Sequence, residues 1–160
     1  MKKDSKGFSL IELLIVVAII LIIAAIAIPN LLRSRIAANQ ASAVGSLRTL
    51  NTAEITFSST YNIGFTNALA WLGPPAAGSN PSSTAAGLID SVLSAGSKSG
   101  YSFTYTPGAS DSTGRIDTYS FTAVPITSST GTNYYYTDQS GVIRQNSTTT
   151  AASTDSPIAG

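Results

Sequence analysis

The carboxylate of Glu12 is the side chain with the clearest potential for chemistry, because it lies near the start of a long apolar run. Between residues 8 and 28 only Ser9 and Glu12 are polar. A carboxylate at the centre of a bilayer costs ~2.5 to 3.5 kcal/mol on insertion scales, so an acidic residue in such a segment marks a functional site by default. We therefore expect Glu12 to have a positively charged partner.

A cation within reach of Glu12 is created if the backbone is cut after Gly7. The new α-amine of Phe8 then lies four residues before the carboxylate, a spacing at which groups on a helix meet. The alternative is that Glu12 needs no partner, because it lies one turn from the helix start and favours the positive end of the helix dipole near the membrane interface. The two explanations differ in whether Glu12 depends on a processed N-terminus.

The element that carries Glu12 is long enough to cross a membrane. At ~1.5 Å per residue a helix over residues 8–28 is roughly 31 Å long, which matches the hydrocarbon core of a bilayer. Three lysines, Lys2, Lys3 and Lys6, lie on its N-terminal side. The positive-inside rule therefore keeps the leader, residues 1–7, in the cytoplasm and directs residues 30–160 outward.

Two segments of the N-terminus form a distinctive pattern, GFSLIELLIVV (residues 7–17) and AAIAIPN (residues 24–30). With these segments the N-terminus resembles that of type IV pilins and of the related pseudopilins of type II secretion systems. This resemblance implies cleavage after Gly7 by a prepilin peptidase, N-methylation of Phe8, and pairing of Glu12 with the N-terminus of a neighbouring subunit during assembly. The part of the chain that carries these motifs is residues 1–35, and the remainder matches the family in layout.

The resemblance also implies a location and partners. The precursor is expected as a single-pass protein of the inner membrane with a cytoplasmic N-terminus, and an inner-membrane assembly platform then polymerises the mature chain into a helical homo-oligomeric filament. Such an extracellular pilus serves adhesion, twitching motility or DNA uptake. A pseudopilin in a periplasmic pseudopilus is the first alternative, and a signal-anchored periplasmic domain that does not polymerise is the second.

An ordinary secretory signal is a further interpretation of the same segment. Residues 25–27 have the small-x-small form of a signal peptidase site, which would place the cut after Ala27. The apolar stretch is longer than the usual 7 to 15 residues of such a signal, and an acidic residue near its start is unusual there. Both observations favour an uncleaved membrane anchor or a prepilin-type N-terminus over cleavage after Ala27.

The composition argues against an enzyme. The chain has no histidine and no cysteine, so the commonest general base, the thiol nucleophile and the usual transition-metal ligands are missing. We expect no catalytic residues and no cofactor. Asp138 and Asp155 are weak candidates for calcium ligands, and the first of them is better explained by a hairpin turn. The scattered basic residues beyond residue 60 predict no nucleic-acid binding.

The remaining pattern predicts an α+β fold in which the helix continues and covers a sheet. Residues 30–60 place apolar side chains every three or four positions, which indicates an amphipathic continuation of the helix, with a kink at Pro29. Residues 61–100 form a variable loop region with a short helix over residues 84–95. Residues 101–145 alternate apolar and polar side chains, which predicts an antiparallel β-meander of three or four strands.

Two expectations concern the C-terminal part of this sheet. Three successive tyrosines, residues 134–136, cannot all face inward, and we expect an exposed one, taken as Tyr135, to contribute to a subunit contact. Residues 146–160 are rich in Ser, Thr and Ala, which predicts a disordered tail.

Overall fold

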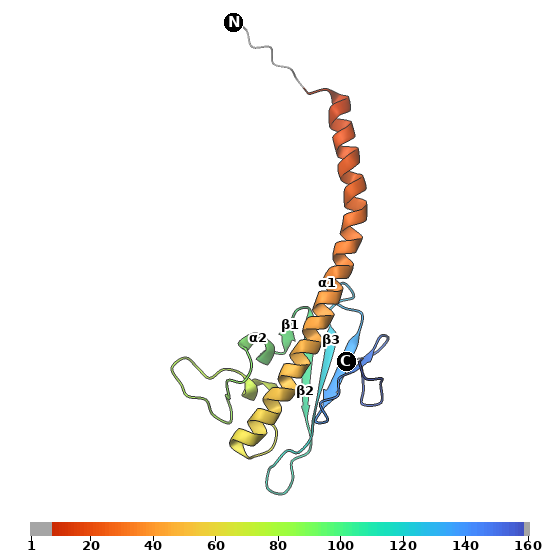
Figure 1. Ribbon diagram of the computed structural model, residues 1–160. Helices are drawn as coiled ribbons and strands as arrows, with labels where there is room; N and C mark the ends of the chain where they lie inside the picture. Colours follow the sequence, from red (N-terminus) through yellow and green to blue (C-terminus); the bar gives the residue numbers. More distant parts are fainter. Residues whose placement is uncertain (1–7, 159–160) are drawn as a thin grey trace. The chain divides into compact units, whose positions relative to one another are not determined.

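The computed structural model describes residues 8–158 (Figure 1). The leader and the expected cleavage residue Gly7 lie outside the described residues. The elements, in chain order, are α1 (Leu10–Tyr61), the 3-10 helix η1 (Leu69–Leu72), α2 (Ser91–Ser94), β1 (Ser97–Lys98), β2 (Tyr101–Pro107), β3 (Tyr119–Pro125), β4 (Tyr134–Asp138) and β5 (Arg144–Asn146). The chain divides into two compact units, Met1–Arg35 and Ile36–Gly160.

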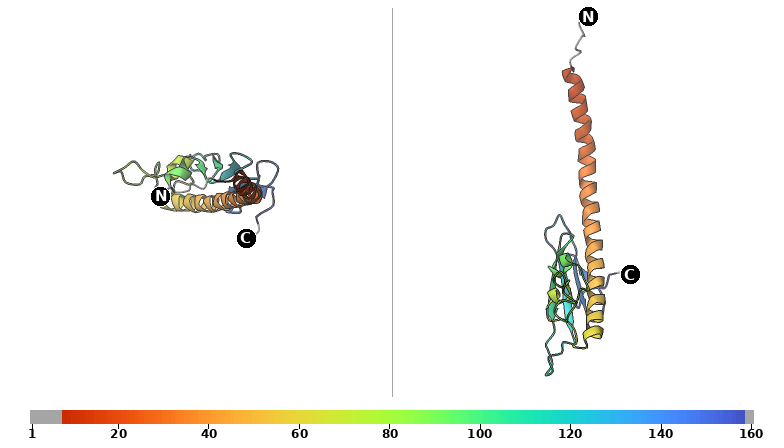
Figure 2. Two further views of the ribbon diagram at one scale, coloured as in Figure 1. Left: turned by 90° about the horizontal axis from the view of Figure 1, so that it is seen from above. Right: turned by 90° about the vertical axis from the view of Figure 1, so that its left-hand side faces the viewer.

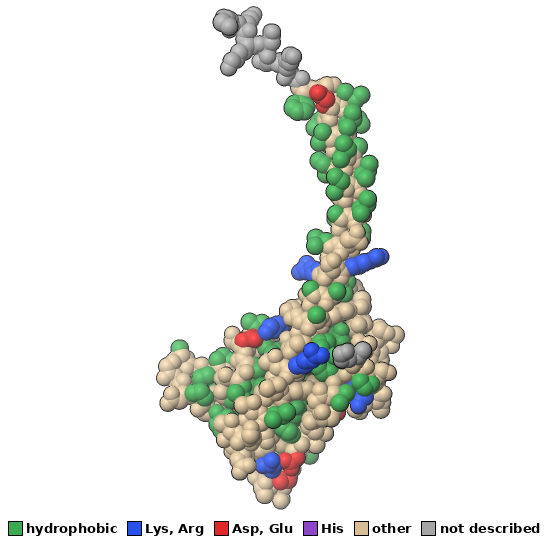
Figure 3. All heavy atoms as spheres, in the orientation of Figure 1, with side chains coloured by type: hydrophobic (Ala, Val, Ile, Leu, Met, Phe, Trp, Pro, Cys, Tyr) green, Lys and Arg blue, Asp and Glu red, His purple; other side chains and the backbone are tan. Residues whose placement is uncertain are grey.

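In the first unit α1 is a helix whose apolar side chains bury almost nothing. On the face shown in Figure 3 hydrophobic side chains follow one another along its first half. By length and composition α1 can cross a membrane. Pro29 is part of the helix, and because proline has no N–H, the carbonyl of Ala25 loses its helical partner there. The kink expected at Pro29 stays a prediction.

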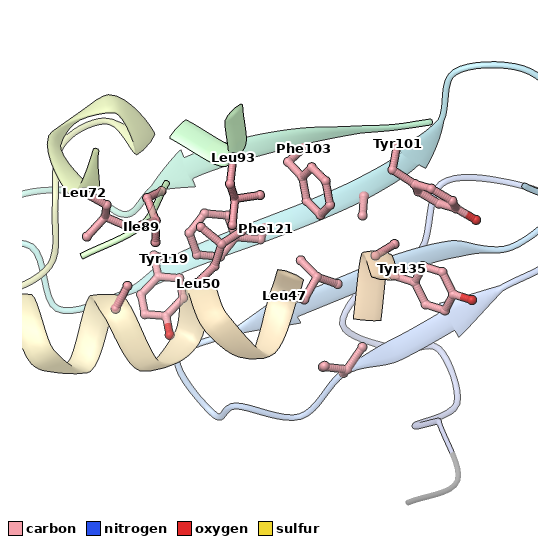
Figure 4. Packing of buried hydrophobic residues seen from close by; sticks show 14 of the residues in the cluster. Leu47, Leu50, Leu72, Ile89, Leu93, Tyr101, Phe103, Tyr119, Phe121 and Tyr135 are labelled. Carbon is pink, nitrogen blue, oxygen red and sulfur yellow. The ribbon is translucent and has the colours of Figure 1, made fainter. Parts of the chain in front are cut away.

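In the second unit α1 is amphipathic and lies along one face of the sheet (Figure 2). Its apolar face is fully or almost fully buried, and it consists of Ala43, Leu47, Leu50, Ala53 and Phe57. These positions recur every three or four residues, as the helical period requires. Figure 4 shows the labelled Leu47 and Leu50 among side chains of the sheet, so one hydrophobic core joins helix and sheet.

The sheet is an antiparallel meander in which each strand pairs with the next along the chain, in the order β1-β2-β3-β4-β5. The α+β fold with a long N-terminal helix is confirmed. The sheet has five strands instead of three or four, because β1 spans two residues and β5 three. Strands this short contain too few residues to display an alternation of apolar and polar side chains.

The side chain of Tyr135 faces the core, so the expectation that it is exposed was wrong. Tyr135 is 4% exposed, and its ring lies 6.0 Å from that of Tyr101. Tyr134 and Tyr136 are half-buried on the opposite face of β4. The reason is the pairing of β4 with β3, which places Tyr135 opposite the fully buried Ala123.

The helix expected over residues 84–95 is reduced to α2. Gly87 adopts a positive φ of 68°, a conformation that interrupts a right-handed helix. The backbone donors of Ala86 and Leu88 bond instead to the carbonyl oxygens of Trp71 and Leu72, at 2.7 and 2.8 Å. Residues 85–89 therefore pair with the chain around η1, and the helix begins only after that pairing ends.

The tail differs from the expected disordered segment, because residues 146–158 fold back onto β5. The backbone N–H of Gln145 donates to the carbonyl of Ser156 at 3.0 Å, and that of Ile158 donates to Ile143 at 2.9 Å. Ala151 is buried. Asp155 closes the returning loop by accepting from the backbone N–H of Ala152 at 2.7 Å, and Ile158 packs against the core. Backbone pairing, apolar contacts and a turn carboxylate together place this polar segment.

Candidate assembly site

Glu12 caps the N-terminus of α1. The backbone N–H of Ser9 donates to Oε2 of Glu12 at 2.9 Å, and the carbonyl of Ser9 accepts from the N–H of Leu13 at 3.3 Å. A Ser followed three residues later by Glu at a helix start is the capping-box sequence, in which the Glu side chain reaches back to the first backbone donor. Residues 9–12 carry this signal, and the sequence analysis missed it.

The cap places the Glu12 carboxylate next to the expected cleavage point. Phe8 is the residue directly before Ser9, and its side chain is 87% exposed. Ser9 and Glu12 are exposed as well. Nothing in the described part of the chain covers this end of the helix, so a charge created at Phe8 and a second helix both have access to the carboxylate.

The apolar side chains that follow are solvent-facing within the isolated chain. Leu13 and Leu14 are each 61% exposed, and Ile28 is 65% exposed. Burying apolar surface stabilises by about 25 cal/mol per Å², so this exposed surface favours a lipid environment or packing against other helices. The segment is thus chemically suited to a membrane and to a filament core.

The structure brings together only part of the predicted site. Glu12 bonds to Ser9, the residue that follows Phe8, whereas Pro29 lies farther along α1. Gly7 lies outside the described residues. The geometry therefore supports a local arrangement of Phe8, Ser9 and Glu12, with Pro29 as a separate feature.

Asp138 and Asp155 each accept a hydrogen bond from a backbone N–H of their own turn, that of Ser140 and that of Ala152. Asp138 Oδ1 accepts from the N–H of Ser140 at 2.9 Å. Asp155 Oδ1 accepts from the side-chain amide of Asn146 at 3.0 Å. Between residues 8 and 158 there is no group of three or more Asp, Glu, His or Cys side chains suited to hold a metal ion. Both carboxylates are explained by local turns.

A second carboxylate of interest is Glu54, which has no other acidic residue near it in the sequence. It is fully buried in the second unit, outside the apolar segment of residues 8–29. Its oxygens accept from the hydroxyl of Thr66 at 2.6 Å and from the N–H of Thr66 at 3.0 Å. Burial raises the pKa of Glu54, and the two hydrogen bonds from Thr66 partly oppose that rise. The sequence does contain a signal for this burial, because Glu54 lies between Leu50 and Phe57 on the apolar face of α1.

Comparisons with known proteins concern the N-terminal region. Residues 2–28 match the family described as the prokaryotic N-terminal methylation motif. Over 53 residues, 33% of this chain, the sequence is 51% identical to the type IV major pilin protein PilA of Myxococcus xanthus and covers 24% of that protein. Over 37 residues, 23% of this chain, it is 65% identical to the type IV wide pilus major component PilA4 of Thermus thermophilus and covers 28% of that protein.

The matched region spans about a quarter of the length of these relatives. No solved structure gives a significant match to the chain. The motif match includes Phe8 and Glu12, and the structure bonds Glu12 to the backbone N–H of Ser9, the residue that follows Phe8. On this sequence evidence, the chain carries the prokaryotic N-terminal methylation motif and resembles type IV major pilins in its N-terminal third.

Proposed function

We propose that this chain is a structural subunit of a type IV pilus that polymerises through its N-terminal helix and has no catalytic role. The observation that carries the proposal is the pairing of an exposed apolar helix with a single carboxylate at its first turn, within the methylation motif. The relatives that share this segment are named as major pilus components. Those names support the proposal for the N-terminal region.

In this proposal the precursor first resides in the inner membrane with its leader in the cytoplasm. A prepilin peptidase cuts between Gly7 and Phe8, and Phe8 is then N-methylated. The cut removes Lys2, Lys3 and Lys6 from the end of the apolar segment. An assembly platform in the inner membrane then transfers the helix from lipid into the filament.

Glu12 gives that transfer its direction and register. Lipid tails and a core of packed apolar helices are similarly apolar, so burial alone gives little preference for the filament. An ion pair between Glu12 and the cleaved N-terminus of a neighbouring subunit does give one, because an unpaired charge is costly in both environments. For that pairing, Glu12 exchanges the backbone N–H of Ser9 for a charged amine.

The decisive experiment is the intact mass of the protein in the sheared extracellular fraction of its native host. A species from Phe8 to Gly160 with one added methyl group is the expected result. If the same mass is found only in the membrane fraction, the chain is a subunit of a periplasmic pseudopilus instead of a pilus. A chain that begins after Ala27 would show an ordinary secretory signal and would refute the proposal.

A further inference from the structure

A pocket of about 460 Å³ lies in the second unit where α1 ends. Its walls come from the segment between α1 and η1, from η1 itself and from the loop between β2 and β3, which lie together at this end of the sheet (Figure 1). The lining residues are Asn62, Ile63, Phe65, Asn67, Trp71, Thr113, Gly114, Arg115 and Ile116. The pocket is distant in sequence from Phe8 and Glu12, and neither the assembly site nor the proposed polymerisation uses it.

Aromatic and apolar surface forms part of this pocket. Trp71 and Phe65 are both half-buried, so each leaves part of its ring accessible. The ring of Phe65 is held by an edge-to-face contact with Tyr119, with centroids 4.6 Å apart. Aromatic faces carry partial negative charge, so they attract the weakly positive C–H groups that line one side of a pyranose ring.

The rest of the lining offers hydrogen-bonding groups that the fold leaves unused. Within residues 8–158 the side chains of Asn62, Asn67 and Trp71 take part in no hydrogen bond, although all three line the pocket. A carboxamide presents two donors and one acceptor, and the indole presents one donor. Adjacent hydroxyl groups of a sugar, each of which donates and accepts, are complementary to such planar groups.

The pocket is electrically close to neutral. Its cation, Arg115, donates from Nε to Oδ1 of Asp117 at 2.7 Å. The Nη1 atom of Arg115 lies 3.5 Å from the carbonyl oxygen of Asn62. The charge is thus balanced by a carboxylate, while the remaining guanidinium N–H groups stay available as donors. This balance favours an uncharged ligand over an anion.

The walls are also fixed before any ligand binds. The N–H of Phe65 donates to the carbonyl of Ile116 at 2.8 Å. Asn62 has a φ of 55° and Gly64 a φ of 87°. Asparagine and glycine are the residues that adopt this left-handed conformation most readily, so the turn suits the residues that form it. Pre-organised walls reduce the entropy lost on binding a small ligand.

We propose that this pocket binds a neutral carbohydrate, with Trp71 and Phe65 supplying the apolar surface for one sugar ring and Asn67, Asn62 and Arg115 supplying hydrogen bonds to its hydroxyl groups. The volume falls within the range of about 300 to 1,000 Å³ that is typical of small-molecule sites. The inference does not depend on filament formation, because every residue that it uses lies in the second unit of a single chain.

Trp71 is the only tryptophan of the chain, so its fluorescence reports directly on the pocket. The full-length protein, in phosphatidylcholine nanodiscs that contain no sugar detergent, is titrated with the methyl glycosides of glucose, galactose and mannose, with N-acetylglucosamine and with cellobiose. Glucuronic acid serves as the anionic probe. We expect a saturable change in Trp71 emission with at least one neutral sugar and a weaker response to glucuronic acid.

The variant Asn67→Ala tests the polar contacts, because Asn67 is exposed and its loss leaves the fold intact. We expect about tenfold weaker binding, the effect of losing one or two hydrogen bonds. Asn80→Ala is the matched control, since Asn80 is exposed and lies outside the pocket. Equal binding by the Asn67 variant, no saturable response to any neutral sugar, or preference for glucuronic acid would each overturn the proposal.

Discussion

Both carboxylate oxygens of Glu54 accept hydrogen bonds from one residue, Thr66, whose carbonyl in turn accepts from the hydroxyl of Tyr105 at 2.6 Å. Glu54 and Thr66 are fully buried. Through these bonds α1, the segment that follows it and β2 are joined at one point. The contact fixes where the chain goes after the long helix, and that segment forms one wall of the proposed carbohydrate pocket.

Replacing Thr66 by Val should destabilise the second unit by about 1 to 3 kcal/mol. The substitution keeps the side-chain shape but removes the hydroxyl donor, which leaves one oxygen of a buried carboxylate without its partner. Urea unfolding followed by Trp71 fluorescence measures the change in the free energy of unfolding. Thr52→Val is the control, because Thr52 is exposed and its hydroxyl bonds only to the carbonyl of Arg48 within its own helix. Equal effects of the two variants would contradict this role of Thr66.

The raised pKa of Glu54 predicts a pH dependence of stability. Above its ordinary pKa of 4.5 the unfolded chain loses this proton, while the folded chain retains it until the raised pKa is passed. The folded state therefore binds more protons in that window, and the free energy of unfolding should fall as the pH rises through it. The measurement is urea unfolding at a series of pH values for the native chain and Glu54→Gln. The difference between the two should change with pH inside the window and level off above it.

Two substitutions of Glu12 separate its two roles. Glu12→Gln keeps an acceptor for the N–H of Ser9 but removes the charge, and Glu12→Ala removes both. If the charge drives assembly, both variants should be processed and inserted into the membrane yet give few filaments. The measurement is filament yield by shearing, alongside the mass of the membrane-bound chain. Near-normal yield from Glu12→Gln with poor yield from Glu12→Ala would assign the effect to the cap instead.

Tyr135→Ser should destabilise the second unit, whereas Tyr134→Ser should have little effect on its stability. Truncating a buried aromatic side chain costs about 3 to 5 kcal/mol, and Tyr135 is buried where Tyr134 is half-buried. Thermal unfolding of both variants gives the comparison. If Tyr134→Ser lowers filament yield without lowering stability, the subunit contact once expected of Tyr135 belongs to its neighbour.

Gly64→Ala should be more damaging than Gly114→Ala, although both glycines have nearly the same backbone conformation. Their φ values are 87° and 84°. A Cβ at Gly64 meets the carbonyl oxygen of Ile116 and lies 2.8 Å from its nitrogen, while a Cβ at Gly114 has open space. The difference in unfolding free energy between the variants therefore isolates the clash from the backbone strain. Equal unfolding free energies of the two variants would mean that the backbone at Ile116 moves away from the new Cβ without loss of stability.

By itself the sequence determined the features that depend on local pattern. A run of apolar side chains with one acid at its start, a helical period up to residue 60 and alternation in β2 and β3 each repeat within a few residues, so they can be recognised without contacts. The resemblance at residues 7–17 was equally local, and the matches to pilin N-termini support it.

Only the tertiary structure decided the features that depend on pairing between distant residues. The short strands β1 and β5 exist because a neighbouring strand supplies partners, and the inward direction of Tyr135 follows from its register against Ala123. The contact of Glu54 with Thr66 and the pocket beside Trp71 have the same origin. In each case the free energy comes from hydrogen bonds and burial between segments, which no local period encodes.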